Sequence, residues 1–312
     1  MKNKKLLGNG ILIFTAAIWG MGFAWQRLGM EDIGPVTFTA AREIISAVFI
    51  GVIAALINSI TKRRRGMTDP DEAATRRGLR ANLKGGIVCG TVLVAATLFQ
   101  QIGIVYTSAG KAGFITAMYM LFVPIITFLL FKKKNSWLVW VAVVTGIAGM
   151  YLLCINERLR LTKGDALMLV CALLYSCHIL CCDHFATRGE PITISAIQFA
   201  AASVISTILA FIVEVPSAEQ VKTAILPILY CGFVSGGMGY TLQMVGQKFA
   251  DPEPASIIMS LEAVFAVLGG TLMLNEKMSA REAAGCIIMF VAIILVQVKL
   301  PDRPDKELSE TE

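Results

Sequence analysis

The sequence predicts an all-α polytopic membrane protein with ten transmembrane helices, arranged as two inverted five-helix repeats. Composition is the first indication, because 56% of the 312 residues are hydrophobic and only 16% are charged. A soluble domain of this size could not bury that much apolar surface. The second indication is a series of apolar windows, each long enough to cross about 30 Å of hydrocarbon. The third is a weak internal repeat.

Ten apolar windows, bounded by polar, Gly or Pro residues, are typical of membrane-spanning helices. The first half contains Gly8–Leu28, Pro35–Asn58, Gly85–Tyr106, Lys111–Phe131 and Trp137–Cys154. The second half contains Asp165–Phe185, Pro191–Glu214, Thr223–Gln247, Pro252–Leu274 and Ala280–Val298. The polar stretch from Asn156 to Arg160 separates the halves.

Positive charge predicts the orientation, because Lys and Arg in short loops are retained on the cytoplasmic side. Most of the 28 Lys and Arg residues fall in segments that are internal if the N-terminus is internal. We therefore expect both termini in the cytoplasm and the chain in a bacterial inner (plasma) membrane. The predicted divisions are a cytoplasmic N-terminus (1–7), a first repeat (8–154) with a basic cytoplasmic loop (59–84), a linker (155–163), a second repeat (164–298) and a cytoplasmic tail (299–312).

Two shifts of the chain against itself bring similar residues together at equivalent helix positions. A shift of 156 residues aligns Trp19 with Tyr175, Pro35 with Pro191 and Arg42 with Gln198, and a shift of 143 aligns Gln100 with Gln243. Because each half has an odd number of helices, the second half enters the membrane from the opposite side. Inverted repeats of this kind are typical of secondary transporters, whose substrate site lies between the halves.

Five short motifs resemble the drug/metabolite transporter superfamily, in the form built from two EamA-type repeats. They are AAIWG at 16–20, AAR at 40–42, TSAGKAGFITAMY at 107–119, PASIIMSLEAVF at 254–265 and NEKMSAREAAG at 275–285. The resemblance implies ten helices, cytoplasmic termini and a central cavity lined mainly by helices 1, 3, 4, 6, 8 and 9. The chain departs from the family pattern at Ala263, where the family often has Pro, and at Lys133, where the second half has Glu276.

Glu262 is the strongest candidate for a functional residue. It lies near the middle of the ninth predicted span, where a charged side chain costs about 3 kcal/mol or more. It is expected to face a cavity, where it could bind a substrate ammonium group or carry a proton. The alternative is a structural hydrogen bond to the backbone or to Ser260.

Three amides and four aromatic residues complete the predicted substrate site. Gln100, Gln101 and Gln243 could orient a polar solute, although Gln also bridges membrane helices without any role in transport. The aromatic candidates are Trp19, Tyr119, Tyr175 and Tyr240. Aromatic walls suit organic solutes and cations, but core packing is their commoner role. Arg42 is expected to be a structural charge.

The sequence favours a secondary transporter that exports or exchanges a small organic metabolite, such as an amino acid, an amine or a drug-like solute, by alternating access. The alternatives are a membrane-embedded enzyme acting on a lipid or peptide, and an exchanger of sugar phosphates or nucleotide sugars. Protons or a counter-substrate are the candidate coupling partners, and membrane lipids surround the chain. We expect no nucleic acid partner, no cofactor and no metal, because the cluster from Cys177 to His184 lies on one helix and offers too few converging ligands. The oligomeric state, the solute and the direction of transport stay open.

Overall fold

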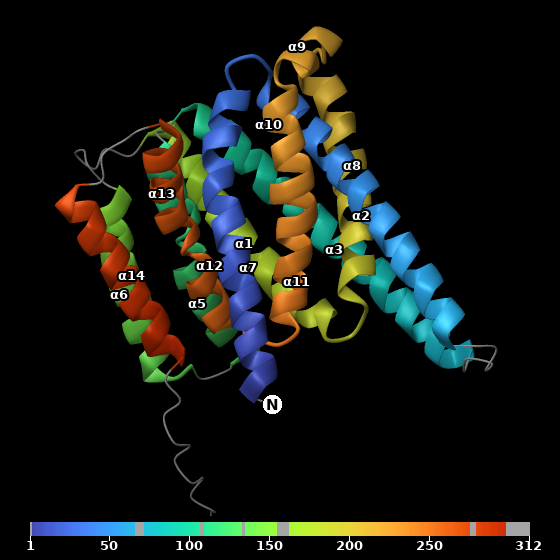
Figure 1. Cartoon of the computed structure of the whole chain (residues 1–312), viewed down its shortest axis with the longest axis horizontal. Helices are drawn as coiled ribbons and strands as arrows, with labels where there is room; N and C mark the ends of the chain where they lie inside the picture. The colour runs from blue at the N-terminus through green and yellow to red at the C-terminus, as the bar shows by residue number, and fades with distance from the viewer. Residues whose placement is uncertain are drawn as a thin grey trace, which may run out of the picture.

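The computed structural model describes residues 2–65, 72–106, 109–132, 135–154, 162–274 and 279–297, and within these ranges it contains helices and no strand (Figure 1). The helices of the first half are α1 (Lys2–Gly29), α2 (Pro35–Arg65), α3 (Glu72–Val105), α4 (Ala109–Thr116), α5 (Tyr119–Phe131) and α6 (Trp137–Cys154). Those of the second half are α7 (Lys163–Ala186), α8 (Pro191–Val213), α9 (Ala218–Thr223), α10 (Ile225–Leu229), the π-helix η1 (Tyr230–Tyr240), α11 (Thr241–Gln247), α12 (Pro252–Met259), α13 (Glu262–Leu274) and α14 (Ala280–Gln297).

Seven helical runs in the described part of the chain are long and apolar enough to cross a membrane. They are Lys4–Gly29, Pro35–Thr61, Gly78–Val105, Ala112–Leu130, Lys163–Ala186, Pro191–Val213 and Ile225–Gln247. Shorter apolar helices occupy Trp137–Leu152 and Ala283–Leu295. The all-helical membrane fold is therefore confirmed, and the number of ten spans stays a prediction.

The internal repeat is visible in the bounds of the helices. A shift of 143 residues carries α4, α5 and α6 onto α12, α13 and α14, with both ends of each helix coinciding, and a shift of 156 carries the first residue of α2 onto that of α8. In Figure 1, α12 leads upward into α13, and α14 descends beside α6. The two halves thus contain copies of one helical unit, whose last helices, α6 and α14, pack against each other.

Each half contains one helix that is interrupted for two residues in the middle of an apolar stretch. The interruptions are Ala117–Met118, between α4 and α5, and Ser260–Leu261, between α12 and α13. At the second break the backbone N–H of Leu261 donates to the carbonyl of Ile258 at 3.2 Å, a tight i→i−3 turn. The first break has the equivalent bond from Met118 to Ile115, at 3.1 Å.

The break in the ninth predicted span forms although Ala263 stands where proline often occurs in the family. Ser260 Oγ donates to the carbonyl of Ile257 at 2.7 Å, and a serine that bonds back to its own helix in this way competes with the regular ladder and bends it. Discontinuous helices at depth are tolerated where the free backbone groups lie inside the protein. The kink therefore does not need a proline.

The eighth predicted span contains a long π-helix, η1, which is rich in glycine. A π-helix leaves some carbonyls free for partners outside the helix, and such segments occur most often at functional sites. Here the indole Nε1 of Trp19 on α1 donates to the carbonyl of Ser235, at 3.0 Å. A side chain at Gly239 would place its Cβ 2.5 Å from that indole nitrogen, so α1 can approach η1 only because this residue is glycine.

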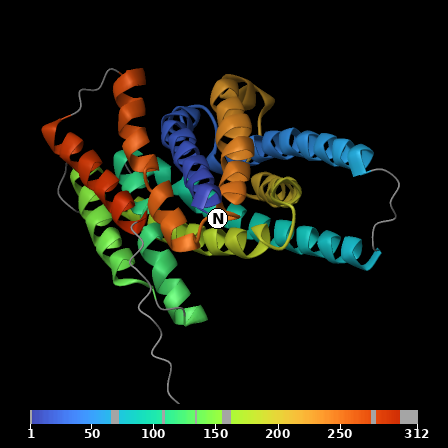
Figure 2. The ribbon, with the colours of Figure 1, turned by 60° about the horizontal axis from the view of Figure 1, so that its bottom comes forward.

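Packing divides the molecule into a central group of helices and two flanks. The largest buried apolar cluster joins residues of α1, α3, α5, α6, α7, α8, α12, α13 and α14. Figure 2 shows α2 and α3 projecting to one side and the α6–α14 pair covering the other. At the outer end of α2, the Glu214 carboxylate accepts bonds from the backbone N–H groups of Val36 and Thr37 at 3.0 and 2.9 Å, which caps that helix from the end of α8.

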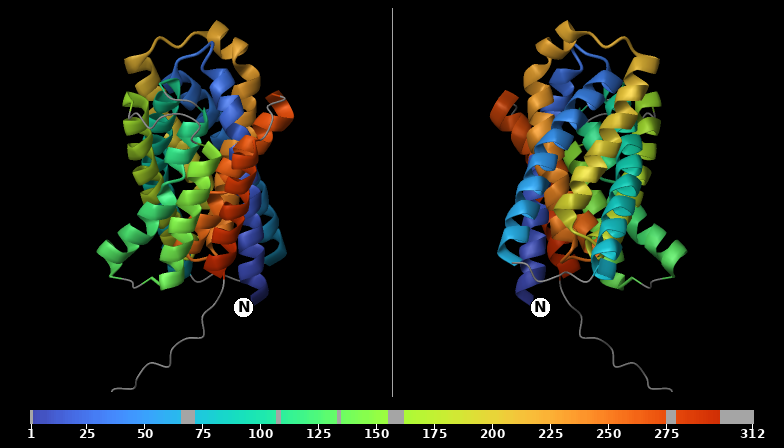
Figure 3. Two further views of the ribbon diagram at one scale, coloured as in Figure 1. Left: turned by 90° about the vertical axis from the view of Figure 1, so that its left-hand side faces the viewer. Right: turned by 90° about the vertical axis from the view of Figure 1, so that its right-hand side faces the viewer.

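The beginning of α1 and the end of α14 lie at the same end of the molecule (Figure 3). Helices α2 and α3 extend past the predicted spans, to Arg65 and from Glu72, so most of the basic segment 59–84 is helical where it is described. Residues 66–71, most of the linker 155–163, the NEKM segment 275–278 and the tail 299–312 lie outside the described residues.

Candidate functional site

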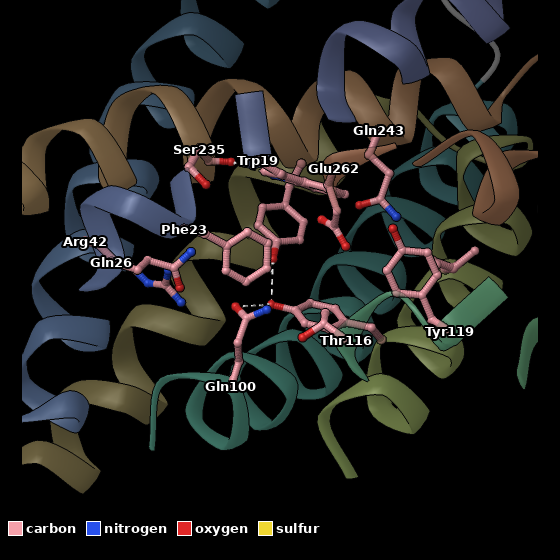
Figure 4. A pocket seen from close by; sticks show the side chains of 13 residues that line it. Trp19, Phe23, Gln26, Arg42, Gln100, Thr116, Tyr119, Ser235, Gln243 and Glu262 are labelled. Carbon is pink, nitrogen blue, oxygen red and sulfur yellow. Dashed lines mark hydrogen bonds between the residues drawn. The ribbon is translucent and has the colours of Figure 1, made fainter. Parts of the chain in front are cut away.

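A partly enclosed cavity with polar and apolar walls lies at the centre of the molecule, between helices of both halves (Figure 4). It offers about 30 Å³ of space to the centres of water-sized molecules. That is room for about two waters, since one water needs roughly 10–15 Å³ on this measure. Its walls are formed by Trp19, Phe23, Gln26, Arg42, Gln100, Thr116, Tyr119, Tyr175, Ile179, Ser235, Tyr240, Gln243 and Glu262.

Seven of the eight predicted substrate-site residues line this one cavity. The exception is Gln101, which is fully buried outside the lining, with both atoms of its amide lacking a hydrogen-bond partner. Gln100 and Gln101 are neighbours on one helix, where successive side chains point about 100° apart, so only one of them can face the cavity. Arg42, expected to be a structural charge, also lines it.

Glu262 is the first residue of α13, directly after the interruption of the span. Its side chain is only 4% exposed, and Oε1 has no hydrogen-bond partner. Ser260, the structural partner considered from sequence, bonds to Ile257 instead. No cation lies within ion-pair distance of Glu262 in the described part of the chain. The side chain of Tyr119 interacts with this carboxyl group, but a buried Oε1 without a partner is still costly.

Helix α1 supports the start of α13 from behind. A Cβ added at Gly20 would lie 2.5 Å from both the carbonyl oxygen of Glu262 and the Cβ of Phe265. The two backbones are therefore in direct contact at this point. The position of Glu262 depends on the absence of a side chain at residue 20.

Aromatic rings form the middle of the cavity, with Tyr240 at their centre. Its ring lies 4.7 Å from that of Trp19 and 6.5 Å from that of Tyr175, measured between centroids. The hydroxyls of Tyr175 and Tyr240 are 2.9 Å apart, and Tyr175 also donates to Gln100 Oε1 at 3.2 Å. These bonds orient the rings and one amide, whereas Gln243 Oε1 has no hydrogen-bond partner. The wall is thus aromatic and has free polar atoms at its edge.

A guanidinium group and a carboxyl group lie toward opposite ends of the cavity. In Figure 4, Arg42 and Gln26 lie at one end, whereas Glu262, Gln243 and Tyr119 lie toward the other. Arg42 is 7% exposed, and its Nη2 has no hydrogen-bond partner. An organic solute with polar groups at both ends would find a partner for each of them.

A second buried carboxylate, Glu43, lies outside the cavity lining and was not among the predicted site residues. It is 1% exposed and accepts a bond from the Thr97 hydroxyl at 3.0 Å. Its carboxyl influences Arg42 electrostatically, but the two groups do not come within 4.0 Å as an ion pair. As helix geometry predicts for adjacent residues, Glu43 does not occupy the donors of Arg42.

Much of the lining consists of residues that the internal repeat relates. The shifts of 156 and 143 residues pair Trp19 with Tyr175, Phe23 with Ile179, Gln100 with Gln243 and Tyr119 with Glu262. The two halves therefore contribute equivalent positions to the cavity lining. Only the last of these pairs joins a neutral residue to an ionisable carboxyl group.

Five lining residues were absent from the predicted site: Phe23, Gln26, Thr116, Ile179 and Ser235. Helical spacing could have found most of them, because Phe23 and Gln26 follow Trp19 on one face, Ile179 follows Tyr175 by four residues, and Thr116 precedes Tyr119 by three. Ser235 carries no such signal, because its position depends on the π-helix.

The cysteine-rich stretch of α7 does not gather ligands. Cys182 Sγ lies 3.5 Å from Nε2 of His178, whose same nitrogen pairs with Gln198 Oε1 at 3.0 Å. Within the described ranges no three His, Cys, Asp or Glu side chains converge on one point. These residues fill the packing between helices.

The fold and the cavity together define a polytopic helical membrane protein with a central, bipolar site shared by two related halves. The chain belongs to the EamA-like transporter family, whose model matches residues 6–155 and 162–298. It is therefore a membrane transporter by family and an integral membrane protein by its apolar helices.

Individual relatives agree with this family. An uncharacterized transporter of Archaeoglobus fulgidus is 26% identical over 297 residues, covering 95% of this chain and 88% of the relative. The uncharacterized transporter YoaV of Bacillus subtilis is 21% identical, covering 94% and 96%. One protein of known crystal structure superposes with a TM-score of 0.73 at 17% identity, covering 95% of this chain and 97% of its own, and this likeness concerns the fold alone.

Proposed function

We propose that the chain is a secondary transporter that exports or exchanges a small organic metabolite bearing an amino group, by alternating access. The observation that carries the proposal is the central cavity, which is lined by repeat-related residues and contains an unpartnered carboxyl oxygen of Glu262. Glu262 receives the ammonium group of the solute or a coupling proton. The amides of Gln100 and Gln243 and the rings of Trp19, Tyr119, Tyr175 and Tyr240 surround the solute.

The size of the cavity supports a cycle with at least two open states. Space for about two waters is too small for an organic solute, so the proposal requires that the helices separate before a solute enters. Two halves of opposite direction can open by rocking about the site between them, first to one side of the membrane and then to the other. The interrupted helices provide the break points at which α5 and α13 move against α4 and α12.

The proposal includes ten spans in two inverted repeats, with both termini in the cytoplasm of a bacterial cell. The shared end of the molecule for the start of α1 and the end of α14 supports this topology. The ninth span is then α12 with α13, and the fifth and tenth spans are α6 and α14. Protons or a counter-substrate drive the cycle.

Replacement of Glu262 by Gln tests the site. The variant keeps the shape of the side chain but cannot carry a charge or release a proton. In proteoliposomes we expect counterflow of the transported solute to fall at least tenfold, because a charge-assisted bond of about 1.5–3 kcal/mol is lost. The solute is found first, by screening wild-type counterflow over labelled amino acids, amines and sugar phosphates.

The matched control is Glu253→Gln. Glu253 is also a buried acid on the same interrupted helix, 3% exposed, but it does not line the cavity. The control is expected to keep most of the counterflow. Equal counterflow by Glu262→Gln and wild type would remove Glu262 from the mechanism, and a wild type that carries none of the solutes would overturn the proposed transport.

A further inference from the structure

We infer that Arg42 forms an anion subsite opposite Glu262, and that the transported solute is dipolar, with a carboxylate at one end and an ammonium group at the other. This inference rests on the proposed function, and it changes the role of Arg42 from structural charge to specificity-determining residue. It assigns a chemical class to each end of the cavity. The residues between the two ends then bind the body of the solute.

The first argument is the state of the Arg42 side chain. A guanidinium always carries its charge and presents five donors, so a buried arginine is normally covered by carboxylates or carbonyls. Arg42 is 7% exposed and faces the cavity, and its Nη2 has no hydrogen-bond partner. The ring of Phe38, 5.9 Å from Cζ, supports one face of the guanidinium. The Nη2 group that stays free can donate to an oxyanion.

The second argument is that neutral residues stand where the repeat would place the same two charges. The shift of 156 residues carries Arg42 onto Gln198, which is fully buried and bonds to the ring of His178 at 3.0 Å. The shift of 143 carries Glu262 onto Tyr119. The scaffold therefore folds around neutral side chains at both positions. The two charges are extra features of this cavity, and both face into it.

The third argument concerns which anion fits. Among the described residues that line the cavity, Arg42 is the single Lys or Arg and Glu262 is the single acid. A phosphate dianion would be neutralised only in part by one guanidinium and would be repelled by the carboxylate of Glu262. A zwitterion with one carboxylate and one ammonium group matches both charges and leaves no excess charge in the buried site. The arrangement thus favours a zwitterion over a sugar phosphate.

The decisive experiment measures binding with three matched probes: L-phenylalanine, phenethylamine and 3-phenylpropionate. The last two lack the carboxylate and the ammonium group respectively. Each probe is added to the purified full chain in detergent, and the rise in unfolding temperature with concentration gives its apparent affinity. The series L-leucine, isoamylamine and 4-methylvalerate repeats the comparison with a smaller body. We expect the zwitterion to bind roughly 10- to 100-fold more tightly than either partner, as two charge-assisted bonds require.

Arg42→Gln should weaken the binding of the probe's carboxylate and leave the binding of its ammonium group unchanged. The variant is expected to bind L-phenylalanine roughly 10- to 100-fold more weakly and phenethylamine as wild type does. Arg42→Lys, which keeps the charge and loses the planar fork, should lie between the two. Arg27→Gln removes a positive charge from a residue of α1 that does not line the cavity, and it should leave all three affinities unchanged.

Three results would overturn the inference. Wild type could bind phenethylamine as tightly as L-phenylalanine, it could bind neither series, or Arg42→Gln could keep the wild-type ratio. If Arg42→Gln does not fold, the Arg42→Lys variant and the wild-type ratios decide the question. Because this experiment measures binding, its outcome is independent of transport. A zwitterion that binds but gives no counterflow would reject the proposed function and keep the anion subsite. Counterflow of amines alone would keep the proposed function and reject the anion subsite.

Discussion

Tyr119 and Glu262 occupy the same position in the two repeats, as the first residue after each helix interruption. The backbone at both positions makes the same tight turn, so the difference between them lies in the side chains alone. One supplies a ring and a hydroxyl, and the other supplies an ionisable carboxyl group. At the scale of single residues, the two repeats therefore have the same backbone turn but different side-chain chemistry.

Tyr175→Phe tests the polar network of the cavity wall. The variant leaves Gln100 Oε1 and the Tyr240 hydroxyl without the partners that they have at 3.2 and 2.9 Å. We expect the free energy of unfolding to fall by about 1–3 kcal/mol, because a buried polar atom is left unpaired. Thermal unfolding in one fixed detergent measures the change. Tyr151→Phe, at an exposed tyrosine on α6, is the control, and equal unfolding temperatures for the two variants would contradict the network.

Close contact between helices sets the site at the scale of elements. Helix α1 packs against α13, α11 and η1, and it contributes Trp19 and Phe23 to the cavity. Its glycines differ sharply in their surroundings. Gly20 touches the backbone of α13, whereas a side chain at Gly10 would have no atom within 4 Å. Replacing each of these two glycines by alanine therefore distinguishes the effect of helix packing from the effect of helix propensity.

Gly20→Ala should destabilise the protein and displace Glu262. Its Cβ would lie 2.5 Å from backbone and Cβ atoms of α13, and overpacking of this kind costs about 1–3 kcal/mol. Gly10→Ala should be neutral or slightly stabilising, because alanine favours a helix over glycine by roughly 1 kcal/mol. Unfolding temperatures and counterflow of both variants check this. If Gly20→Ala unfolds no earlier than Gly10→Ala, the contact between α1 and α13 does not support the site.

At the scale of the whole molecule, the proposed rocking of the halves requires that contacts at each end of the bundle break in turn. Lys5 on α1 forms an ion pair with Asp251, just before α12, at 3.2 Å. Both side chains are about half exposed, so the pair contributes little stability and is easily opened. It joins the first half to the second at the end where α1 begins.

A crosslink at this pair should stop the cycle. In Lys5→Cys with Asp251→Cys, a short bifunctional thiol reagent would hold α1 against the start of α12. We expect counterflow to be lost after crosslinking and kept by either single variant treated in the same way, because only the double variant ties the halves together. Gel mobility after cleavage between the halves measures the extent of crosslinking. Full counterflow by completely crosslinked protein would show that this end of the molecule does not open.

The membrane class and most helix positions could be predicted from the sequence because they depend on local quantities. Spans such as Pro35–Asn58 follow from the length of an apolar window against the thickness of the bilayer. The equivalence of Gln100 and Gln243 follows from a constant shift along the chain. The interruption at Ser260–Leu261 did not follow, because the equivalent break at Ala117–Met118 forms without a serine, so no residue type marks the position of the break in the sequence.

The direction of each side chain was decided only by the tertiary structure. Gln100 faces the cavity and Gln101 does not, and Arg42 faces it whereas Glu43 bonds to Thr97 beyond it. Adjacent side chains of a helix point about 100° apart, and the pattern of residue types does not tell which of the two faces the cavity. The sequence by itself determined that polar groups would lie inside the membrane, because apolar length and buried charge are properties of one segment. Which groups meet around the cavity was determined by the rotation and crossing of helices far apart in the chain, because a shared cavity exists only once those helices pack.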